Sequence, residues 1–415
     1  MTSTTETQRT AATVRAQRAV YVAFIGAGFG FASWASRIPQ IRDALQASPS
    51  ELGLILLAVA VGSLIAMPLA GIVVTRIGAA RATAIMAGVL AVGLVIVAIG
   101  YQIGELPVVI GLFLIGFGNG TWDVAMNVEG AAVEQRLNRA IMPRFHAGFS
   151  VGTVLGALGG AVMVALDVPV TAHLLVVAVI VASIVPASSL RGFLAREVER
   201  SSDGSEVPRE KGPNPLMAWR EPRTLLIGLF VLCMAFTEGT GNDWLAVAMI
   251  DGYGAVPVIG PLTFATFLAA MTLGRWFGPN LIDKFGRVIV VRTSALVALV
   301  GLMLVVFGHF IPVAFIGAVL WGLGAALGFP VGMSAAADDP RRSAARVSVV
   351  ASIGYSAFLA GPPLIGFLGD QVGVLRALTV AAGLLALAAM IAGTTRPLDG
   401  SDVTSASVGH RAPPG

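Results

Sequence analysis

The sequence predicts an all-helical membrane protein with twelve transmembrane helices arranged in two six-helix bundles. Of the 415 residues, 56% are hydrophobic and only 12% are charged, whereas a soluble globular chain has about 25% charged residues. The apolar residues also form repeated runs, and a helix needs about 20 of them to cross a bilayer. These two observations exclude a soluble enzyme, and the runs are too long for a disordered chain.

The predicted spans follow one another with short polar segments between them. The first six cover residues 18–38, 52–74, 82–101, 106–128, 145–166 and 169–189. The last six cover residues 224–248, 258–280, 288–308, 312–334, 347–368 and 374–394. Each run is long enough to cross the bilayer as a helix.

The hydrophilic segment between the two sets of spans, residues 191–223, is rich in Glu, Arg, Ser, Gly and Pro and predicts a solvated cytoplasmic linker. The expected organisation is a cytoplasmic tail at 1–17, a bundle at 18–190, this linker, a second bundle at 224–395, and a disordered cytoplasmic tail at 396–415. Residues 1–13 are also expected to be disordered. The first span is too polar at its end for a cleaved signal peptide.

Lys and Arg are distributed unequally between the two sides of the predicted bundles. If the N-terminus is cytoplasmic, that side contains Arg15, Arg18, Arg76, Arg81, Arg136, Arg139, Arg144, Lys284, Arg287, Arg292, Arg341, Arg342, Arg346 and Arg396. The exceptions near the other side are Arg37, Arg42 and Arg376. The positive-inside rule therefore predicts that both termini are cytoplasmic.

Several classes of partner are not expected. Cys233 is the single cysteine and the four His are scattered, so neither a disulfide framework nor a metal site is predicted. The basic residues do not form a patch, which argues against nucleic acid. The sequence has no GxxxxGK[ST] loop to hold ATP. We expect no cofactor, with the proton gradient as the energy source.

Two short loops occupy equivalent positions in the two halves. The first follows the second span and contains Gly71, Thr75, Arg76 and Gly78. The second follows the eighth span and contains Asp283, Lys284, Gly286 and Arg287. Such a loop combines a turn that glycine permits with basic side chains that bind helix C-terminal carbonyls and a neighbouring acid. Two of them at equivalent positions indicate an internal repeat of six spans.

At these loops the sequence resembles the major facilitator superfamily, whose motif is Gly, three residues, Asp, Arg or Lys, one residue, Gly, then Arg or Lys. The resemblance covers nearly the whole chain and implies a secondary transporter. Thr75 replaces the acidic residue of the motif in the first loop. If this acid latches one conformation, as the resemblance implies, the first latch is weakened and Asp283 has more of that role.

Other segments resemble a narrower bacterial branch of the superfamily, which includes a rhizobial membrane protein associated with rhizopine, an inositol derivative. These segments are FASWASRIP at 31–39, GNGTWDVAMNVE at 118–129 and FHAGFSVG at 145–152. The fifth span also contains Gly152, Gly156, Gly159 and Gly160, a series that is similar to the glycine-rich motif of the superfamily's antiporters. Close helix packing by small residues is the alternative explanation of this series.

Polar residues inside the fourth and fifth spans are candidate site residues, because such groups are costly in a bilayer unless they face a cavity or a partner. Asn119, Asp123 and Asn127 recur at helical spacing and are expected to face inward. His146 is close enough in the chain to pair with Asp123 or with Glu129, and Glu129 lies off the stripe and is expected to be structural. A pair with His146 is either a proton relay or a structural ion pair.

Glu238 lies near the middle of the seventh span, and Asn242 and Asp243 follow it toward the outer side. A lone carboxyl at this depth favours its protonated form because burial penalises the charge. Glu238 is therefore a candidate for loading and releasing a proton, and the alternative is a permanently protonated glutamic acid that bonds a neighbouring helix. Asn242 and Asp243 are candidate substrate contacts.

Three residues in the outer thirds of the first and seventh spans are further substrate-binding candidates. Trp34 and Trp244 could form an aromatic clamp on a sugar-like ring, or lie at the membrane interface as Trp often does. Arg37 either contacts a substrate or extends to the interface. In the second half, the clusters at 328–330 and 361–363 contain Gly and Pro and predict local bending of their helices.

Together these features predict a secondary transporter that moves a small polar organic solute across the cytoplasmic membrane, through a central site and by alternating access. The preferred solute is a sugar, a polyol or a related metabolite, and proton coupling through Glu238 and Asp123 is the preferred drive. The alternatives are a drug or metabolite efflux antiporter and a transport-inactive membrane receptor. The protein is expected to be a monomer and not an enzyme, because no nucleophile, base and orienting group recur at suitable spacing.

Overall fold

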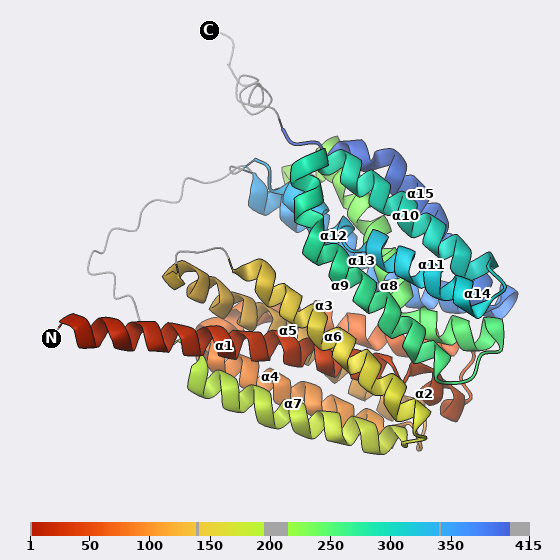
Figure 1. Ribbon diagram of the computed structural model, residues 1–415, viewed down its shortest axis with the longest axis horizontal. Coiled ribbons are helices and arrows are strands. Elements are labelled where there is room, and N and C mark those ends of the chain that lie inside the picture. The colour runs from red at the N-terminus through yellow and green to blue at the C-terminus, as the bar shows by residue number, and fades with distance from the viewer. Residues whose placement is uncertain (1, 138–140, 195–214, 340–341, 399–415) are drawn as a thin grey trace, which may run out of the picture.

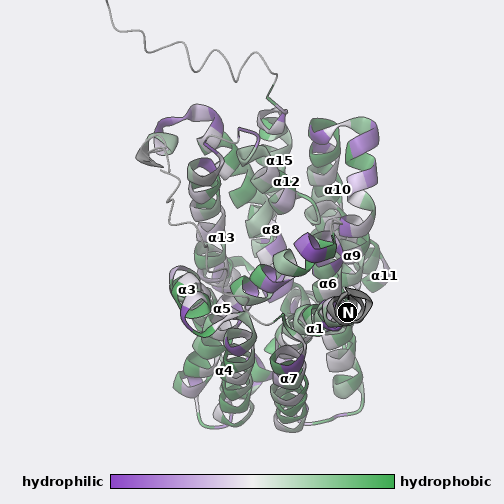
Figure 2. Cartoon of the chain, turned by 90° about the vertical axis from the view of Figure 1, so that its left-hand side faces the viewer, coloured by the Kyte–Doolittle hydropathy of each residue, from purple (hydrophilic) through white to green (hydrophobic). Residues whose placement is uncertain are grey.

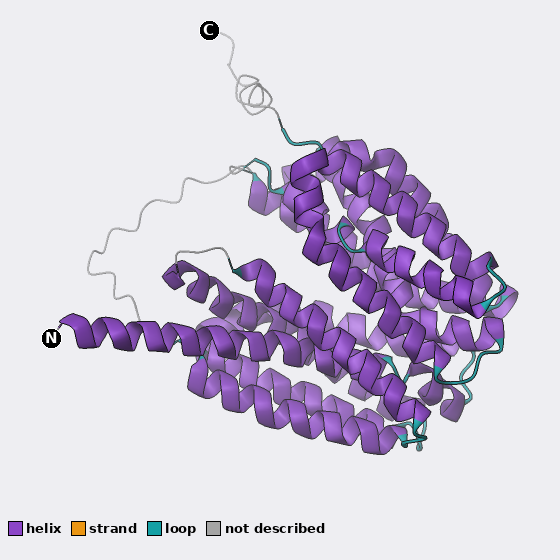
Figure 3. Cartoon of the chain, in the orientation of Figure 1, coloured by secondary structure: helices purple, strands orange, loops and turns teal. Residues whose placement is uncertain are grey.

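The computed structural model describes residues 2–137, 141–194, 215–339 and 342–398, and its regular elements are all helical (Figures 1 and 3). The first half contains α1 (Thr2–Ala35), α2 (Ile38–Leu45), α3 (Pro49–Ile77), α4 (Ala79–Gly100), α5 (Glu105–Leu137), α6 (Met142–Ala165) and α7 (Val170–Gly192). The second half contains η1 (Pro215–Arg220), α8 (Pro222–Tyr253), α9 (Ile259–Phe285), α10 (Arg287–Phe307), α11 (Ile311–Ala325), α12 (Gly328–Ala336), α13 (Ser343–Val372), α14 (Val374–Ala377), α15 (Thr379–Ile391) and η2 (Ala392–Thr395). The predicted all-α class is confirmed.

Eleven helical stretches in the described part of the chain are long and apolar enough to cross a membrane. The remaining predicted span corresponds to α9, which has 27 residues but is less apolar because it contains Arg275 together with several Thr, Gly and Pro residues. Hydrophobic residues predominate along the helices (Figure 2). All twelve predicted spans therefore correspond to helices of the structure.

The N-terminal segment differs from the expectation. We expected residues 1–13 to be disordered, but α1 begins at Thr2 and continues into the first span. Residues 2–17 contain neither Gly nor Pro, and adding residues to an existing helix is far easier than starting a new one. The expected disorder at 399–415 and most of the expected linker lie outside the described residues.

The two Gly and Pro clusters of the second half behave differently. The tenth span is interrupted, because α11 ends at Ala325 and α12 begins at Gly328. The eleventh span is not, since α13 contains Pro362 and Pro363 within one helix. Neighbouring helices make Pro tolerable in a membrane span, and here the Pro362 carbonyl packs against Gly53 of α3.

Each half is a bundle whose helices pack closely. In the first half α5 packs against α3 and α4, and α1 packs against α6 and α7. In the second half α8 packs against α13 and α15, and α10 packs against α11. The halves meet where α3 lies against α13 and where α6 lies against α9 (Figure 1). These are the second span with the eleventh and the fifth with the eighth, so equivalent helices of the repeat form both contacts.

The glycine series of the fifth span is a packing surface for α1. A Cβ atom at Gly152 would lie 2.1 Å from the backbone oxygen of Ile25, and one at Gly156 would lie 2.6 Å from that of Phe29. A Cβ atom at Gly160 would meet the hydroxyl of Ser36, whereas Gly159 has open space around it. Small residues allow such close approach between membrane helices. Helix packing therefore accounts for three of the four glycines.

Candidate functional site

An ion pair lies in the interior of the second half. The Nη2 atom of Arg275 on α9 donates to Oε1 of Glu238 on α8 at 2.7 Å. The Glu238 side chain is 17% exposed and that of Arg275 is 32% exposed. The expectation of a lone carboxyl at Glu238 is therefore wrong, because the cation comes from a neighbouring span.

Arg275 is positioned by the interruption between α11 and α12. Its Nε donates to the backbone oxygen of Ala326, at 3.4 Å, just after the last residue of α11. Gly274 allows α9 to approach this break, since a Cβ atom there would lie 2.6 Å from the Cβ of Ala326. A helix end leaves carbonyl groups without intrahelical partners. The break thus supplies an acceptor for the same guanidinium that binds Glu238.

Arg275 was not among the candidate site residues predicted from the sequence, although one feature of the sequence indicates it. It is an arginine inside a predicted span, at 258–280. The rule that singles out Glu238, that ionisable residues within a membrane face a partner or a cavity, applies equally to Arg275.

The first half contains a polar stripe on α5, as predicted. The Asn127 side chain donates to the backbone oxygen of Asp123 at 2.8 Å and to its Oδ1 at 3.2 Å. Asn119 lies one turn earlier on the same helix and is half-buried. Tyr355 of α13 lies within electrostatic range of Asp123. The stripe therefore lies near a helix of the other half.

Two further candidates on α8 lack polar partners in the described part of the chain. The Oδ1 atom of Asn242 is buried without a hydrogen bond. Asp243 is half-buried, and the described hydrogen bonds and ion pairs do not include it. Buried polar groups are usually satisfied, so an unsatisfied one indicates a place for water or a ligand. Both residues lie within about one and a half turns of Glu238.

His146 forms neither of the predicted pairs. Its ring packs at 5.1 Å from that of Phe24, and it lies within electrostatic range of Arg275. Asp123 binds Asn127 instead, and the Oε1 atom of Glu129 accepts a hydrogen bond from the backbone N–H of Leu194 at 2.5 Å. The expected pairing on the fifth span is therefore absent from the described contacts, because the two acids find other partners.

Arg37 is buried inside the first half and bonded to groups of that half. It is 2% exposed, donates from Nε to Nδ1 of His173 at 3.0 Å, and donates from Nη2 to the backbone oxygen of Val168 at 2.8 Å. These contacts do not fit a side chain that extends to the interface, whereas contact of Arg37 with a substrate stays a prediction. The chain turns between α1 and α2 at this residue, which directs the guanidinium toward α7 rather than outward.

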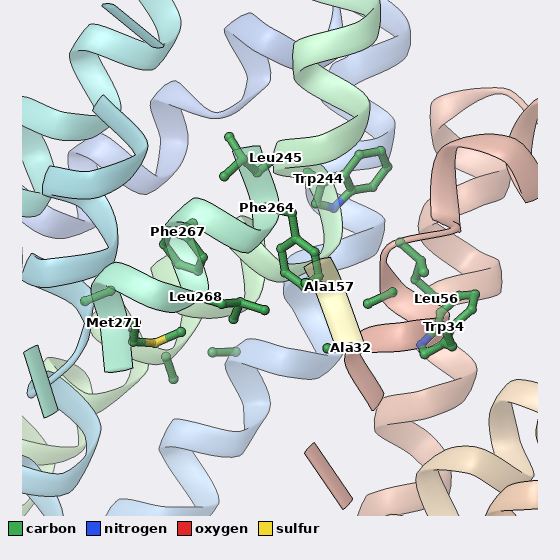
Figure 4. Close-up of a cluster of buried hydrophobic side chains, with 14 of the residues drawn as sticks. Ala32, Trp34, Leu56, Ala157, Trp244, Leu245, Phe264, Phe267, Leu268 and Met271 are labelled. Atoms are coloured by element: carbon green, nitrogen blue, oxygen red, sulfur yellow. The ribbon is translucent and has the colours of Figure 1, made fainter. Parts of the chain in front are cut away.

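Trp34 and Trp244 lie in one buried apolar cluster with Leu56 and Phe264 (Figure 4). Trp34 is 3% exposed and Trp244 is fully buried. Both indoles are therefore buried inside the protein rather than exposed on its outer surface. In this conformation both rings are covered by apolar side chains, so contact with a solute would require the cluster to open.

The described polar contacts between the two halves lie at one end of the molecule. Arg42 of α2 binds both carboxylate oxygens of Asp251 on α8, at 2.9 Å for the Nη2–Oδ1 contact. Ser50 of α3 donates to Asp370 of α13 through its hydroxyl and its backbone N–H. We call this end the joined end.

The loops with the glycine and arginine motif lie at the other end, which we call the basic end. Gly78 ends α3 with φ +83°, and Gly286 ends α9 with φ +82°. Their N–H groups donate to Val74 and Ile282 at 3.0 and 2.8 Å. A positive φ favours glycine, so the two turns of the repeat have the same conformation for the same reason.

Side chains of the two motif loops differ in their contacts. Arg287 donates to both carboxylate oxygens of Asp338 at 3.0 Å and to the backbone oxygen of Thr395 at 3.3 Å, as expected for a basic residue beside a helix end. Lys284 lies 5.2 Å from the centre of the Phe285 ring. Asp283 is exposed, and the described contacts show no partner that it latches.

A second ionic cluster at the basic end was not predicted. Glu221, just before α8, accepts from Arg342 at 3.0 Å and from Arg346 at 2.6 Å. Burial raises the pKa of Glu221, but hydrogen bonds from Arg346 and Thr224 outweigh it and hold the pKa below its usual range.

The described residues contain no group of His, Cys, Asp and Glu that could hold a metal ion.

Comparison with known proteins identifies the family. The model of the Major Facilitator Superfamily matches residues 20–342. The chain belongs to the major facilitator superfamily. It is 31% identical over 378 residues to the uncharacterized transporter y4wD of Sinorhizobium fredii. The aligned residues cover 90% of this chain and 97% of that protein. It is 28% identical over 381 residues to the membrane protein MosC of Rhizobium meliloti, covering 90% and 89%. The predicted resemblance to a bacterial branch with a rhizobial member is confirmed.

Solved structures share the fold of this superfamily member. The nucleoside transporter NupG superposes with a TM-score of 0.72 at 13% identity, covering 92% of this chain and 98% of that one. The fucose:proton symporter FucP of E. coli superposes with a TM-score of 0.59 at 19% identity, covering 92% and 98%. The protein is therefore a multi-pass membrane protein of a family of secondary transporters, and it is not an enzyme.

Proposed function

We propose that the protein moves a small polar organic solute, a sugar, a polyol or a related metabolite, across the bacterial inner membrane by alternating access coupled to protons. The observation that carries this proposal is the Glu238–Arg275 ion pair inside the membrane, on the same helix as two polar groups without described partners, Asn242 and Asp243. Ionisable groups at this depth mark substrate and proton pathways.

The solute class follows from the unsatisfied groups. Asn242 offers a carbonyl oxygen that accepts hydrogen bonds, and Asp243 offers a carboxylate. A hydroxylated solute supplies the O–H donors that both require. Two transporters with the same fold, NupG and FucP, are named for a nucleoside and for fucose, which are hydroxylated solutes. This supports the proposal by analogy of fold.

The coupling mechanism is a competition between a proton and Arg275 for Glu238. A carboxyl group that binds a proton loses the charge that an ion pair requires. Protonation of Glu238 would release Arg275, and His146 of α6 lies within range of the freed charge. Because α6 packs against α9 at the contact between the halves, this release would alter the contact that alternating access must change.

The orientation follows from the charge distribution. We place the basic end and both termini in the cytoplasm, by the positive-inside rule. The joined end then faces outward, and the conformation is closed on that side. Reporter fusions after Ser202 and after Gly254 test this orientation, because they should give opposite signals. Identical signals would contradict it.

Uptake into liposomes tests proton coupling. Glu238→Gln preserves the shape and the hydrogen-bonding capacity of the side chain but removes its titration. We expect accumulation driven by an imposed pH gradient to fail, while solute binding, measured by thermal shift against sugars and polyols, persists. Asp123→Asn is the comparison for the first half. Undiminished accumulation by Glu238→Gln would exclude this residue as the coupling site.

The thermal-shift screen also separates the proposed solutes from the alternative of drug efflux. Sugars and polyols should raise the unfolding temperature of the parent protein. A response to lipophilic cations alone would favour an exporter, and binding without counterflow in liposomes would indicate a receptor that does not transport.

A further inference from the structure

A groove at the basic end lies outside the candidate substrate site. It has a volume of about 690 Å³ and lies between α1 and α7. Three arginines line it, Arg15 and Arg18 from α1 and Arg191 from α7, and Val14 and Val22 form part of its apolar wall. This volume is within the range of about 300–1,000 Å³ that small-molecule sites occupy.

The groove results from the sequence of the two helices. Val14, Arg18 and Val22 recur every four residues, so they form one row along α1, and Arg15 begins the neighbouring row. On α7, Gly192 has no side chain to fill the space, since a Cβ atom there would lie 2.5 Å from the Cβ of Ala19. The end of α7 therefore lies close to α1 with Arg191 beside it.

The three guanidinium groups differ from the paired arginines of the second half at this end. Arg223, Arg287 and Arg346 each form an ion pair with an aspartate or glutamate of the second half. Arg15, Arg18 and Arg191 are exposed, and the hydrogen bonds and ion pairs described for the chain do not include their side chains. An arginine cluster without acids attracts an anion, and guanidinium binds phosphate in a bidentate manner.

We propose that this groove binds an anionic phospholipid of the surrounding leaflet. The phosphate lies among Arg15, Arg18 and Arg191, and an acyl chain runs along the apolar side chains of α1. Charge complementarity selects the headgroup. Arg15 and Arg18 lie at the start of the first predicted span and Arg191 lies at the end of α7, which matches the depth of phosphates at a bilayer surface. The apolar wall distinguishes a lipid from free phosphate, which would gain nothing from Val14 and Val22.

Native mass spectrometry of the full-length protein in detergent tests the proposal, with phosphatidylglycerol, phosphatidylcholine and inorganic phosphate as separate additions. We expect phosphatidylglycerol to bind the parent protein. The variant Arg15→Gln/Arg191→Gln should bind it about tenfold more weakly or worse, because each basic residue near the surface contributes to anionic-lipid affinity. The matched control Arg81→Gln/Arg220→Gln removes the same charge from exposed arginines at the same end and should bind as the parent does.

Three outcomes would overturn the proposal. The first is equal affinity for phosphatidylcholine, and the second is an equal loss of affinity in the control variant. The third is binding of inorganic phosphate as tight as that of the lipid. Thermal unfolding of each variant without lipid verifies that it is folded.

Discussion

At the scale of single residues, the ion pair with Arg275 changes the role that Glu238 can have in transport. A carboxyl without a partner could load a proton simply because burial penalises its charge. Under the proposed proton coupling, a carboxyl in an ion pair would exchange its cation for the proton, so protonation of Glu238 would free Arg275 of α9. The carbonyl of Ala326 keeps Arg275 in place in the paired conformation.

The first prediction concerns this pair. Arg275→Met leaves the Glu238 carboxylate without its cation and should lower stability, whereas Glu238→Gln/Arg275→Met removes both charges and should recover part of the loss. We expect an interaction free energy of about 0.5–3 kcal/mol from the double-mutant cycle, measured by thermal unfolding in detergent. Additive effects would show that the two side chains act independently.

At the scale of helices, glycine determines which elements can touch. Three glycines of α6 let it approach α1 closely, and Gly53 lets α3 approach Pro362 of α13. The two motif glycines have a different use, because they end α3 and α9 with positive φ. The same residue type therefore sets both the spacing of helices and the turns between them.

The second prediction concerns the contact between α1 and α6. Gly152→Ala places a methyl group against the backbone of Ile25, so it should lower the free energy of unfolding by about 1–3 kcal/mol. Gly159→Ala is the matched control, because that position has open space. It should leave stability unchanged or raise it, since Ala is the better helix former by about 0.5–1 kcal/mol. Equal melting temperatures for the two variants would contradict the packing role.

The third prediction concerns the start of α8 and the start of α13. The pKa of Glu221 is lowered in the folded protein, so its contacts with Arg342 and Arg346 stabilise the fold above the ordinary pKa of Glu, about 4.3, and this contribution is lost as the pH falls through the lowered value. Glu221→Gln should therefore melt at a lower temperature than the parent at pH 7, and the difference should shrink toward pH 4 and below. A difference that is constant with pH would exclude titration of Glu221 as its cause.

At the scale of the whole molecule, polar contacts at the joined end keep the two halves together in this conformation. The Arg42–Asp251 and Ser50–Asp370 contacts connect the halves where α2 and α3 meet α8 and α13. The apolar cluster with Trp34 and Trp244 lies buried between elements of both halves (Figure 4). Opening this end must separate the polar contacts and expose that cluster.

The fourth prediction tests this closure. Asp251→Asn weakens the contact with Arg42 across the halves, so a cysteine placed at the buried Leu56 should react faster with an impermeant maleimide added outside, after Cys233 has been replaced. Asp43→Asn is the matched control, because Asp43 also binds Arg42 but belongs to the same half. Equal labelling rates in all three proteins would show that the Arg42–Asp251 pair does not hold this end closed.

The sequence alone determined the membrane class, the positions of the twelve spans, the two motif loops and the candidate carboxylates Asp123 and Glu238. These features are local, because hydropathy over about 20 residues and the identity of one residue in an apolar run need no knowledge of distant contacts. The equivalence of the turns at Gly78 and Gly286 was likewise visible as a repeated pattern.

Only the tertiary structure decided which charged and polar side chains meet. Glu238 binds Arg275, 37 residues away, Arg42 binds Asp251, 209 residues away, and Arg37 turns inward to His173, 136 residues away. The chain pattern places each of these residues on a helix but does not fix the rotation and the neighbours of that helix. Those depend on helix packing, which is set by side-chain shape, by close approach at glycine and by the cost of leaving a charge unpaired in the membrane.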